Sequence, residues 1–271
     1  LENIEISDVA AEGKSLARVN EMVVFIPYGA PGDIVDVKLD KKKKSYGEGH
    51  IVAMKQPSQI RIEPFCEHFG VCGGCKWQHL PYEYQLKYKR QQVVDALQRI
   101  AKVELPEVND ILGSERIRHY RNKLEYTFSN RSWLTYEQMQ SGEEFPDRNA
   151  LGFHIPGAFD KVLDIKKCWL QDDISNDIRL FLRNYALSKG YTFYDLRAQN
   201  GLMRTIMLRT TGTGEIMLIV VFGEPNHEAI SDVMAALKER FPAITSLQYV
   251  INLKVNDTIA DQEIITYSGR D

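Results

Sequence analysis

The sequence has no apolar run of the roughly 20 residues that a membrane-spanning helix needs. Its first five residues, Leu1 to Glu5, are polar and acidic, so we expect no secretory signal. Positive charge is not in excess, since 34 Lys and Arg face 37 Asp and Glu for a net charge of −3. That balance argues against a globally basic nucleic-acid binder. It does not exclude local basic stripes, which are what a phosphate backbone meets.

Cysteine is also scarce, with four among 271 residues, and three of the four fall within ten residues. In a secreted domain of this size, four cysteines would indicate two disulfides. The close spacing and the absence of a secretory signal favour reduced thiols in the cytoplasm instead. The rest of the composition, 44% hydrophobic and 26% charged, is ordinary for a globular protein. The length allows one large domain or two modest ones.

Turn signals divide residues 1–57 into short alternating segments. These segments cover 4–9, 23–26, 34–39 and 49–54, a spacing that predicts a small β-barrel. Strand-rich modules of this size with basic loops often bind oligonucleotides. A loop between two of the expected strands carries Lys41, Lys42, Lys43 and Lys44, with Tyr46 just behind them. This run is either a solvated loop or a loop that contacts phosphates.

The rest of the chain alternates between helical and strand patterns. We expect helices over 82–102, 172–188 and 227–240, a strand over 117–129, a hairpin over 203–222, and strands over 246–253 and 262–267. In the strand over 117–129, alternation places Leu124, Tyr126 and Phe128 on one face. Antiparallel strands flanked by helices make this an α+β domain. The predicted fold class is α+β, with a small OB-like barrel before a central α+β domain.

The cysteines form the pattern that carries the most chemistry. Cys66, Cys72 and Cys75 are separated by five and then two residues, and the intervening glycines allow the backbone to wrap around one centre. Cys168 is the only cysteine left as a fourth ligand. A [4Fe–4S] cluster tolerates a distant fourth thiolate, whereas structural zinc usually shows two close cysteine pairs. The remaining alternative is that the four cysteines are buried and bind no metal. His68 and His79 are expected to pack nearby rather than to bind metal.

A second basic segment precedes the strand core. Arg116, Arg118, His119, Arg121 and Lys123 lie in an eight-residue stretch without an acid, so they can present a positive stripe to phosphates. Ordinary surface charge on an edge strand is the alternative. Trp77 and Tyr46 are aromatic residues that either stack on bases or pack within the protein.

These motifs resemble a known family. Cys66 to Cys75, followed by Gln78 and His79, resembles the cluster loop of the RNA uracil-5-methyltransferases, which use S-adenosylmethionine to make 5-methyluridine in ribosomal or transfer RNA. Residues 1–57, with Phe25-Ile26-Pro27 and Pro31-Gly32-Asp33, look like the TRAM barrel that precedes the cluster in many members. The resemblance covers essentially the whole chain, because it continues through Tyr120-Arg121-Asn122-Lys123, Gly152-Phe153-His154, 163–168 and Asn256-Asp257-Thr258-Ile259.

The resemblance also implies what this chain lacks. In the family, a cysteine attacks C6 of uracil before the methyl group moves to C5, and that cysteine lies in a C-terminal Rossmann-like domain that holds S-adenosylmethionine. Here all four cysteines are already assigned, and no glycine-rich strand-to-helix turn is visible. We therefore expect only the N-terminal and central portion of the family, with the catalytic domain absent. This chain would then have no catalytic residue and no S-adenosylmethionine site, and would not methylate RNA alone.

The resemblance assigns a role to each part of the chain. Residues 1–57 would be an RNA-binding TRAM barrel, 58–80 the iron–sulfur loop, 81–106 a helix that packs on the missing catalytic domain, and 107–271 the central α+β domain that supplies Cys168 and an RNA-binding surface. The expected partner is RNA, ribosomal rather than transfer RNA, and the expected state is a monomer. A stand-alone iron–sulfur RNA-binding module and a redox protein are the alternatives. We expect a structural cluster, since methyl transfer needs no electron.

Overall fold

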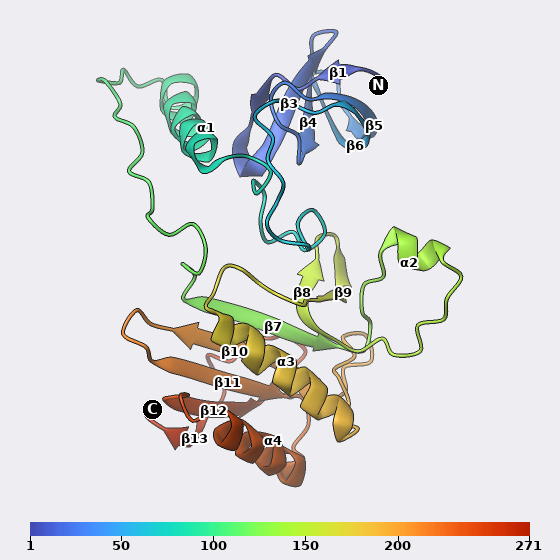
Figure 1. Ribbon diagram of the computed structural model, residues 1–271, viewed down its shortest axis with the longest axis vertical. Coiled ribbons are helices and arrows are strands. Elements are labelled where there is room, and N and C mark those ends of the chain that lie inside the picture. Colours follow the sequence, from blue (N-terminus) through green and yellow to red (C-terminus); the bar gives the residue numbers. More distant parts are fainter. The chain divides into compact units, whose positions relative to one another are not determined.

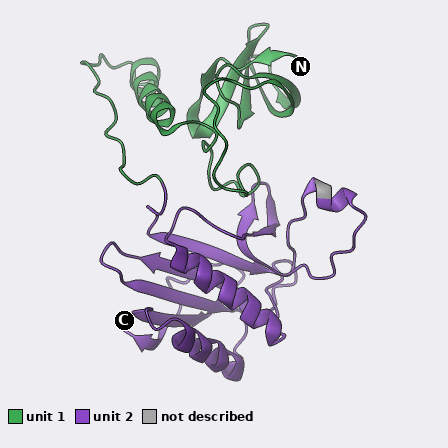
Figure 2. Cartoon of the chain, viewed as in Figure 1, with its two compact units in different colours: residues 1–117 green, residues 118–271 purple. Residues whose placement is uncertain are grey.

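The computed structural model describes residues 1–136 and 138–271. It divides into two compact units, Leu1–Ile117 and Arg118–Asp271 (Figure 2). The division falls later in the chain than the predicted boundary between residues 106 and 107. In the part of the chain that the structure describes, no helix is both long and apolar enough to cross a membrane.

The first unit begins with a curled six-stranded sheet (Figure 1). Its strands are β1 (Ile4–Glu5), β2 (Asp8–Val9), β3 (Lys14–Val19), β4 (Met22–Pro27), β5 (Ile34–Lys42) and β6 (Tyr46–Gln56), and a short 3-10 turn, η1 (Ala11–Gly13), precedes β3. The strand order is β1-β5-β6-β4-β3-β2, antiparallel except where β4 meets β6. The sheet encloses a core of Ile6, Ala17, Val24, Ile26, Val35 and Val37.

Strand β3 is the element of this sheet that the hydrophobic pattern did not predict. Its buried positions are Ser15 and Ala17, whereas Leu16 is only partly buried. The inward face therefore carries small side chains, and the usual apolar alternation is inverted. The Ser15 hydroxyl donates a hydrogen bond to the Ile26 carbonyl at 2.8 Å, so its burial leaves no polar group unsatisfied.

The helix expected over 82–102 is α1 (Tyr82–Asp95) followed by a π-helical turn, η2 (Ala96–Ile100). Only Tyr88 is buried in α1, against Val9, Ala30 and Leu80. The apolar residues toward its end face solvent, with Val93 52% and Ile100 81% exposed. Packing of this helix on another domain stays a prediction. Residues 101–122 form no helix or strand.

The second unit is a seven-stranded sheet with two long helices on one face (Figure 1). The strand order is β13-β12-β11-β10-β7-β8-β9. The strands are β7 (Lys123–Ser129), β8 (Ala150–Ile155), β9 (Ala158–Asp164), β10 (Met203–Thr210), β11 (Ile216–Phe222), β12 (Ser246–Ile251) and β13 (Ile265–Gly269). The helices are α2 (Tyr136–Gln140), α3 (Asp173–Ser188) and α4 (His227–Arg240), of which α3 and α4 cover the sheet.

Two predictions for this sheet need correction, and two of its strands were missed. The sheet is mixed, because β11 and β12 are parallel and α4 provides the crossover between them. The strand expected over 117–129 begins only at Lys123, since the amides of His119 and Arg121 donate to the carbonyls of Trp169 and Leu170 instead. Strands β8 and β9 were not predicted.

Strand β8 lacks the usual strand signal because its first three residues are all buried, so the two faces do not alternate in polarity. Gly152 lies at its centre, where an added Cβ would sit 1.9 Å from the Leu163 carbonyl oxygen of β9. The two backbones therefore approach more closely there than any other residue would permit. The predicted buried face of β7 is confirmed, with Leu124 6% exposed and Tyr126 and Phe128 fully buried.

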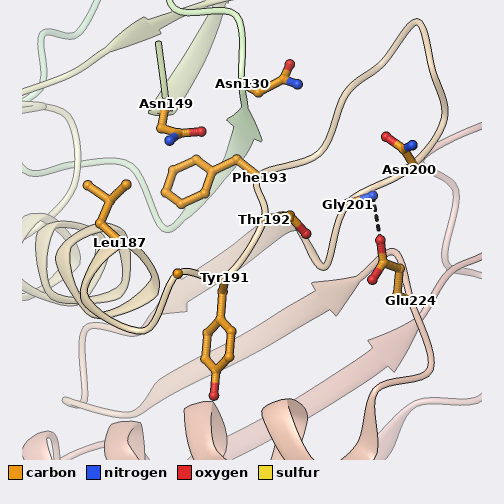
Figure 3. Close-up of a pocket in the computed structure, with 10 residues that line it drawn as sticks. Asn130, Asn149, Leu187, Tyr191, Thr192, Phe193, Asn200, Gly201 and Glu224 are labelled. Atoms are coloured by element: carbon orange, nitrogen blue, oxygen red, sulfur yellow. Dashed lines mark hydrogen bonds between the residues drawn. The ribbon is translucent and has the colours of Figure 1, made fainter. Parts of the chain in front are cut away.

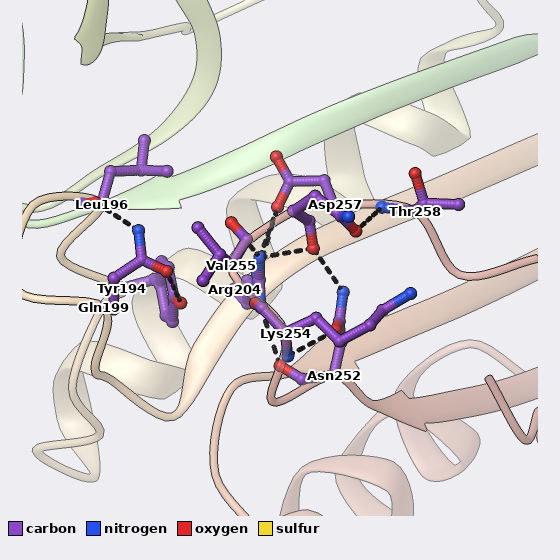
Figure 4. A network of polar contacts seen from close by, with 10 residues as sticks. Tyr194, Leu196, Gln199, Arg204, Asn252, Lys254, Val255, Asp257 and Thr258 are labelled. Atoms are coloured by element: carbon purple, nitrogen blue, oxygen red, sulfur yellow. Dashed lines mark hydrogen bonds and ion pairs between the residues drawn. The ribbon is translucent and has the colours of Figure 1, made fainter. Parts of the chain in front are cut away.

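The opposite face of the sheet is covered by an irregular segment, residues 252–262, that Arg204 of β10 holds in place (Figure 4). The Arg204 side chain is 1% exposed. It donates to the carbonyls of Asn252 and Lys254 at 2.7 Å, to that of Asn256 at 2.8 Å, and to the Asp257 carboxylate at 2.9 Å. The segment carries Ile259 onto a cluster of Ile219, Val221 and Val250.

Candidate nucleic-acid interface

The lysine run lies at the end of the first unit's longest hairpin. Lys41 and Lys42 belong to β5, opposite Glu48 and Gly47 of β6, and only Lys43 and Lys44 lie in the turn. All four side chains are exposed. The expected loop is therefore half strand, which fixes the spacing of the first two ammonium groups. Among the described residues, none of the four forms an ion pair.

Tyr46 follows the turn and is held against the sheet. Its ring meets Phe25 edge to face, with centroids 6.3 Å apart. The Lys43 ammonium lies 5.4 Å from the centre of the same ring. These contacts fix the ring beside the lysines. Tyr46 therefore packs within the protein on one side, which was the alternative to stacking on bases. The hairpin tip remains a cationic surface with one aromatic residue at its base.

The linker after the barrel is fixed by a buried ion pair. The Asp33 carboxylate is fully buried and accepts from Arg61, from the Ser58 amide at 2.8 Å and from the Ala30 amide at 2.6 Å. Burial raises the pKa of the Asp33 carboxyl, but the hydrogen bonds from Arg61 and the two amides outweigh it and hold the pKa below its ordinary value. The Pro31-Gly32-Asp33 turn thereby anchors residues 58–61.

His79 attaches the other end of the cysteine loop to the same barrel. Its side chain is 1% exposed, and Nε2 donates to the Gly29 carbonyl at 3.0 Å. Burial lowers the pKa of His79, so the ring stays neutral at neutral pH. The prediction that this histidine packs rather than binds metal agrees with this environment. Trp77 likewise packs against the cluster of Val9, Ala30, Leu80 and Tyr88.

Between these anchors the chain turns tightly around the three cysteines. The Phe69 amide donates to the Cys66 carbonyl, and the Cys72 amide donates to the His68 carbonyl, both at 3.0 Å. Gly70 and Gly73 have positive φ values of 86° and 74°, which is why these turns need glycine. Burial raises the pKa of the Cys66 thiol, and the nearby Cys75 raises it further.

Cys168 is placed by helix α3 of the second unit. The Asn176 side chain accepts from the Cys168 amide at 2.8 Å and donates to its carbonyl at 3.0 Å. One turn further along, the fully buried Arg179 donates to the carbonyls of Leu151, Ile165 and Lys166. The sequence pattern did not predict either residue, because a polar side chain within a helix is usually exposed.

The four thiols have the chemistry of a metal or cluster donor set, with Cys66, Cys72 and Cys75 in the first unit and Cys168 in the second. Among the described residues, no three Cys, His, Asp or Glu side chains come close enough to hold a metal ion. The cluster on Cys66, Cys72, Cys75 and Cys168 is therefore not confirmed and stays a prediction.

The second basic segment only partly forms a stripe. All four of its predicted contact residues are exposed: Arg116, Arg118, Arg121 and Lys123. The Lys123 ammonium, however, forms an ion pair with the Glu125 carboxylate at 3.3 Å, which lowers the net positive charge of the segment. The Arg118 guanidinium lies 5.2 Å from the Trp169 ring, and the Lys167 ammonium lies 4.1 Å from it. Lys167 was not predicted as part of this basic surface. Neither was Arg209, which lies opposite Lys123 in the register of β10 with β7.

Residues 2–52 match the family model of the TRAM domain. The N-terminal barrel therefore resembles a TRAM domain. The matched residues lie within the module expected over 1–57 and include the lysine run.

The whole chain is similar to RNA methyltransferases. It is 56% identical over 273 aligned residues to an uncharacterized RNA methyltransferase of Porphyromonas gingivalis, covering 99% of this chain. It is 50% identical to one of Bacteroides thetaiotaomicron, covering 97% of this chain. In both cases the match covers 59% of the relative, so this chain spans a little over half their length.

A solved structure shares the fold. It is the tRNA (uracil-54, C5)-methyltransferase of Pyrococcus abyssi in complex with S-adenosyl-L-homocysteine, at a TM-score of 0.62 and 21% identity. The match covers 94% of this chain and 52% of that one. At this identity the likeness establishes the fold.

These alignments correct one expectation. The chain was expected to be a non-catalytic fragment, confined to an N-terminal and central portion from which the catalytic domain is absent. Instead, the similarity to RNA methyltransferases runs through 97–99% of the chain. The expectation of a detached, non-catalytic recognition module is therefore wrong.

The described residues assign no position to S-adenosylmethionine. The glycine-containing turn between β10 and β11 joins two antiparallel strands, which is not the strand-to-helix turn that cradles a nucleotide. This turn therefore does not fit that cofactor.

Proposed function

We propose that this protein is an RNA methyltransferase acting on C5 of uridine, and that its TRAM domain and basic surfaces bind the RNA. The observation that carries the proposal is the 56% identity over nearly the whole chain to an RNA methyltransferase, together with a TRAM domain whose hairpin tip exposes four lysines. Uridine C5 as the target follows from the resemblance of the cysteine loop and is supported by the shared fold.

The chemistry of the described surface suits RNA backbone contact. Four exposed ammonium groups on one hairpin release counterions when they meet phosphates, so binding weakens steeply with salt. Because Lys41 and Lys42 sit on a strand, their side chains are spaced by the sheet and not by a flexible loop. Tyr46 supplies an aromatic edge beside them.

The reaction is tested in cells that encode the protein. Deleting its gene should remove 5-methyluridine from one position of one RNA, measured by mass spectrometry of RNA digests. Ribosomal RNA is the expected substrate, and transfer RNA is analysed in the same samples. An unchanged 5-methyluridine content in both would overturn the assignment.

RNA binding is tested with the purified protein. Replacing Lys41 to Lys44 with Gln should weaken binding to a single-stranded RNA and flatten its dependence on salt, by about 0.7 in the log–log slope for each phosphate that the variant no longer neutralises. The control is Lys238→Gln, an exposed lysine of α4, which should change neither quantity. A wild-type protein whose RNA affinity does not depend on salt would refute the interface.

A further inference from the structure

A cavity of about 440 Å³ lies within the second unit, where β7 and α3 end (Figure 3). Asn130 and Asn149 lie on one side of it, and Asn200, Gly201 and Glu224 lie on another. Its size falls in the range of about 300–1,000 Å³ that small-molecule sites occupy. Neither the TRAM domain nor any of the four cysteines contributes to it.

The lining mixes polar and apolar side chains and carries no cation. Among the described residues around the cavity, three asparagines and Thr192 are neutral, and Glu224 is the one charged group. A phosphate or carboxylate ligand would meet a negative wall without a compensating donor cluster, so the site does not suit an anion. A flat, neutral ring that donates hydrogen bonds suits it better.

The Asn130 amide supplies a buried acceptor. Its Nδ2 donates to the Asp195 carboxylate at 3.0 Å, which fixes the orientation of the amide, because a carboxylate can only accept. Asp195 also accepts from the amides of Arg197 and Ala198, and these hydrogen bonds hold its pKa well below the ordinary value. The Asn130 Oδ1 is left buried, with no partner among the described residues. An unsatisfied buried acceptor is costly, and because this oxygen has almost no accessible surface, a ligand in the cavity meets it only if the Asn130 side chain turns.

The opposite wall is set by a close backbone approach. One Glu224 oxygen accepts from the Gly201 amide at 2.9 Å, and its second oxygen has no hydrogen bond within the described chain. Gly201 has a φ of +123°, and an added Cβ would lie 2.7 Å from the Phe193 carbonyl oxygen. Only glycine keeps this wall open. Tyr191 points its hydroxyl away, to the Asp232 carboxylate at 2.8 Å.

We propose that this cavity binds an unpaired RNA base, and that guanine fits it best. Glu224 offers acceptor oxygens, and the side chains of Asn149 and Asn200 line the same cavity. Guanine presents a ring N–H and an exocyclic amino group, whereas uracil presents a single N–H. RNA is recognised mainly through such unstacked bases, read on their hydrogen-bonding edges. The inference rests on the proposed function, since it takes RNA to be the partner, and it adds a base-reading subsite apart from the phosphate-contacting lysines.

The test uses the full chain and three probes: GMP, UMP, and a single-stranded RNA that contains guanosines, compared with oligouridine. Isothermal titration should show saturable binding of GMP, at least tenfold weaker for UMP, and a preference for the guanosine-containing RNA. GMP binding without an RNA preference would identify a free-nucleotide site and overturn an RNA subsite.

Two variants probe the walls. Glu224→Gln keeps an acceptor for the Gly201 amide and removes the negative charge, so guanine binding should fall about tenfold while the melting temperature holds. Asn130→Ala should also weaken guanine binding. If that variant fails to fold, the result for Glu224→Gln alone decides the test. Glu215→Gln, in the exposed turn after β10, is the matched control.

The outcomes separate the two proposals. No saturable GMP binding, or equal binding by Glu224→Gln, overturns the base pocket. If RNA binding through the lysine run survives in that case, the proposed function stands. Loss of all RNA binding in the wild-type chain would overturn both.

Discussion

Arg61 Nη2 lies 2.6 Å from the Asp33 carboxylate, and the pair joins the TRAM barrel to the linker 28 residues further along the chain. The Asp33 side chain is completely buried, whereas that of Arg61 is 22% exposed. The same guanidinium also donates to the Tyr28 carbonyl at 2.8 Å. One ion pair therefore fixes the exit of the barrel and the start of the cysteine loop together.

Replacing Asp33 with Ala should destabilise the protein strongly. The change leaves the Arg61 guanidinium without its carboxylate and two amides without an acceptor, and breaking such a buried pair costs about 3–5 kcal/mol. Urea denaturation measures the loss in the free energy of unfolding. Asp40→Ala is the control, because Asp40 pairs with His50 at an exposed position and should cost at most about 1 kcal/mol. Equal losses in the two variants would contradict the role of burial.

The same carboxylate predicts how stability depends on pH. Its pKa is below the ordinary 3.8 in the folded state, so the folded protein binds its proton less readily than the unfolded chain does. Its stabilisation is therefore fully present above about pH 4 and is lost as the pH falls through the folded-state pKa. The difference in unfolding free energy between wild type and Asp33→Ala should shrink in that acid range, measured by denaturation at several pH values. A constant difference would show that Asp33 does not contribute through its charge.

Asn176 should protect Cys168. Asn176→Ala removes both hydrogen bonds to the Cys168 backbone, which should cost about 1–3 kcal/mol for the two groups left unsatisfied. It should also speed the modification of the Cys168 thiol by a maleimide, located by peptide mass spectrometry. Asn184→Ala, a position of the same helix outside its buried face, is the control. If labelling of Cys168 is unchanged, Asn176 does not hold the segment.

The predicted cluster has a direct test. Protein purified without air should contain iron and sulfide and absorb visible light, and Cys72→Ala should lose that absorption and misfold if the cluster is structural. Zinc in place of iron would support the alternative metal reading. Wild-type protein that is folded and contains neither iron nor zinc would refute the prediction of a cluster. A soluble, stable and colourless Cys72→Ala would instead argue against a structural role.

How much of this fold could be predicted depends on which residues face inward. Strands with large inward side chains, such as the one that carries Leu124, Tyr126 and Phe128, followed from alternation alone. Strand β3 did not, because Ser15 and Ala17 are the residues it buries. The parallel pairing of β11 with β12 did not follow either, since a local pattern does not encode which neighbour a strand chooses.

The candidate sites divide in the same way. The exposure of Lys41 to Lys44 followed from charge, and the turns of the cysteine loop followed from its glycines. Asn130, Asn176 and Arg179 could not be found, because nothing in the sequence separates a polar residue that bonds buried backbone from one that meets solvent. Their roles depend on long-range contacts, such as that between Asn130 and Asp195, 65 residues apart.

Arg204 gathers the carbonyl groups of an irregular segment that has no regular secondary structure to satisfy them. Residues 252–258 therefore owe their order to Arg204 and to a few side-chain hydrogen bonds of Asn252 and Asn256, and not to a cooperative ladder. If the hydrogen bonds of Arg204 break, the segment and Ile259 can separate from the sheet as one unit while α3, α4 and the strands stay folded. The exposed underside would be the apolar patch of Ile219, Val221 and Val250. The second unit thus has a built-in seam, where partial opening costs less than global unfolding.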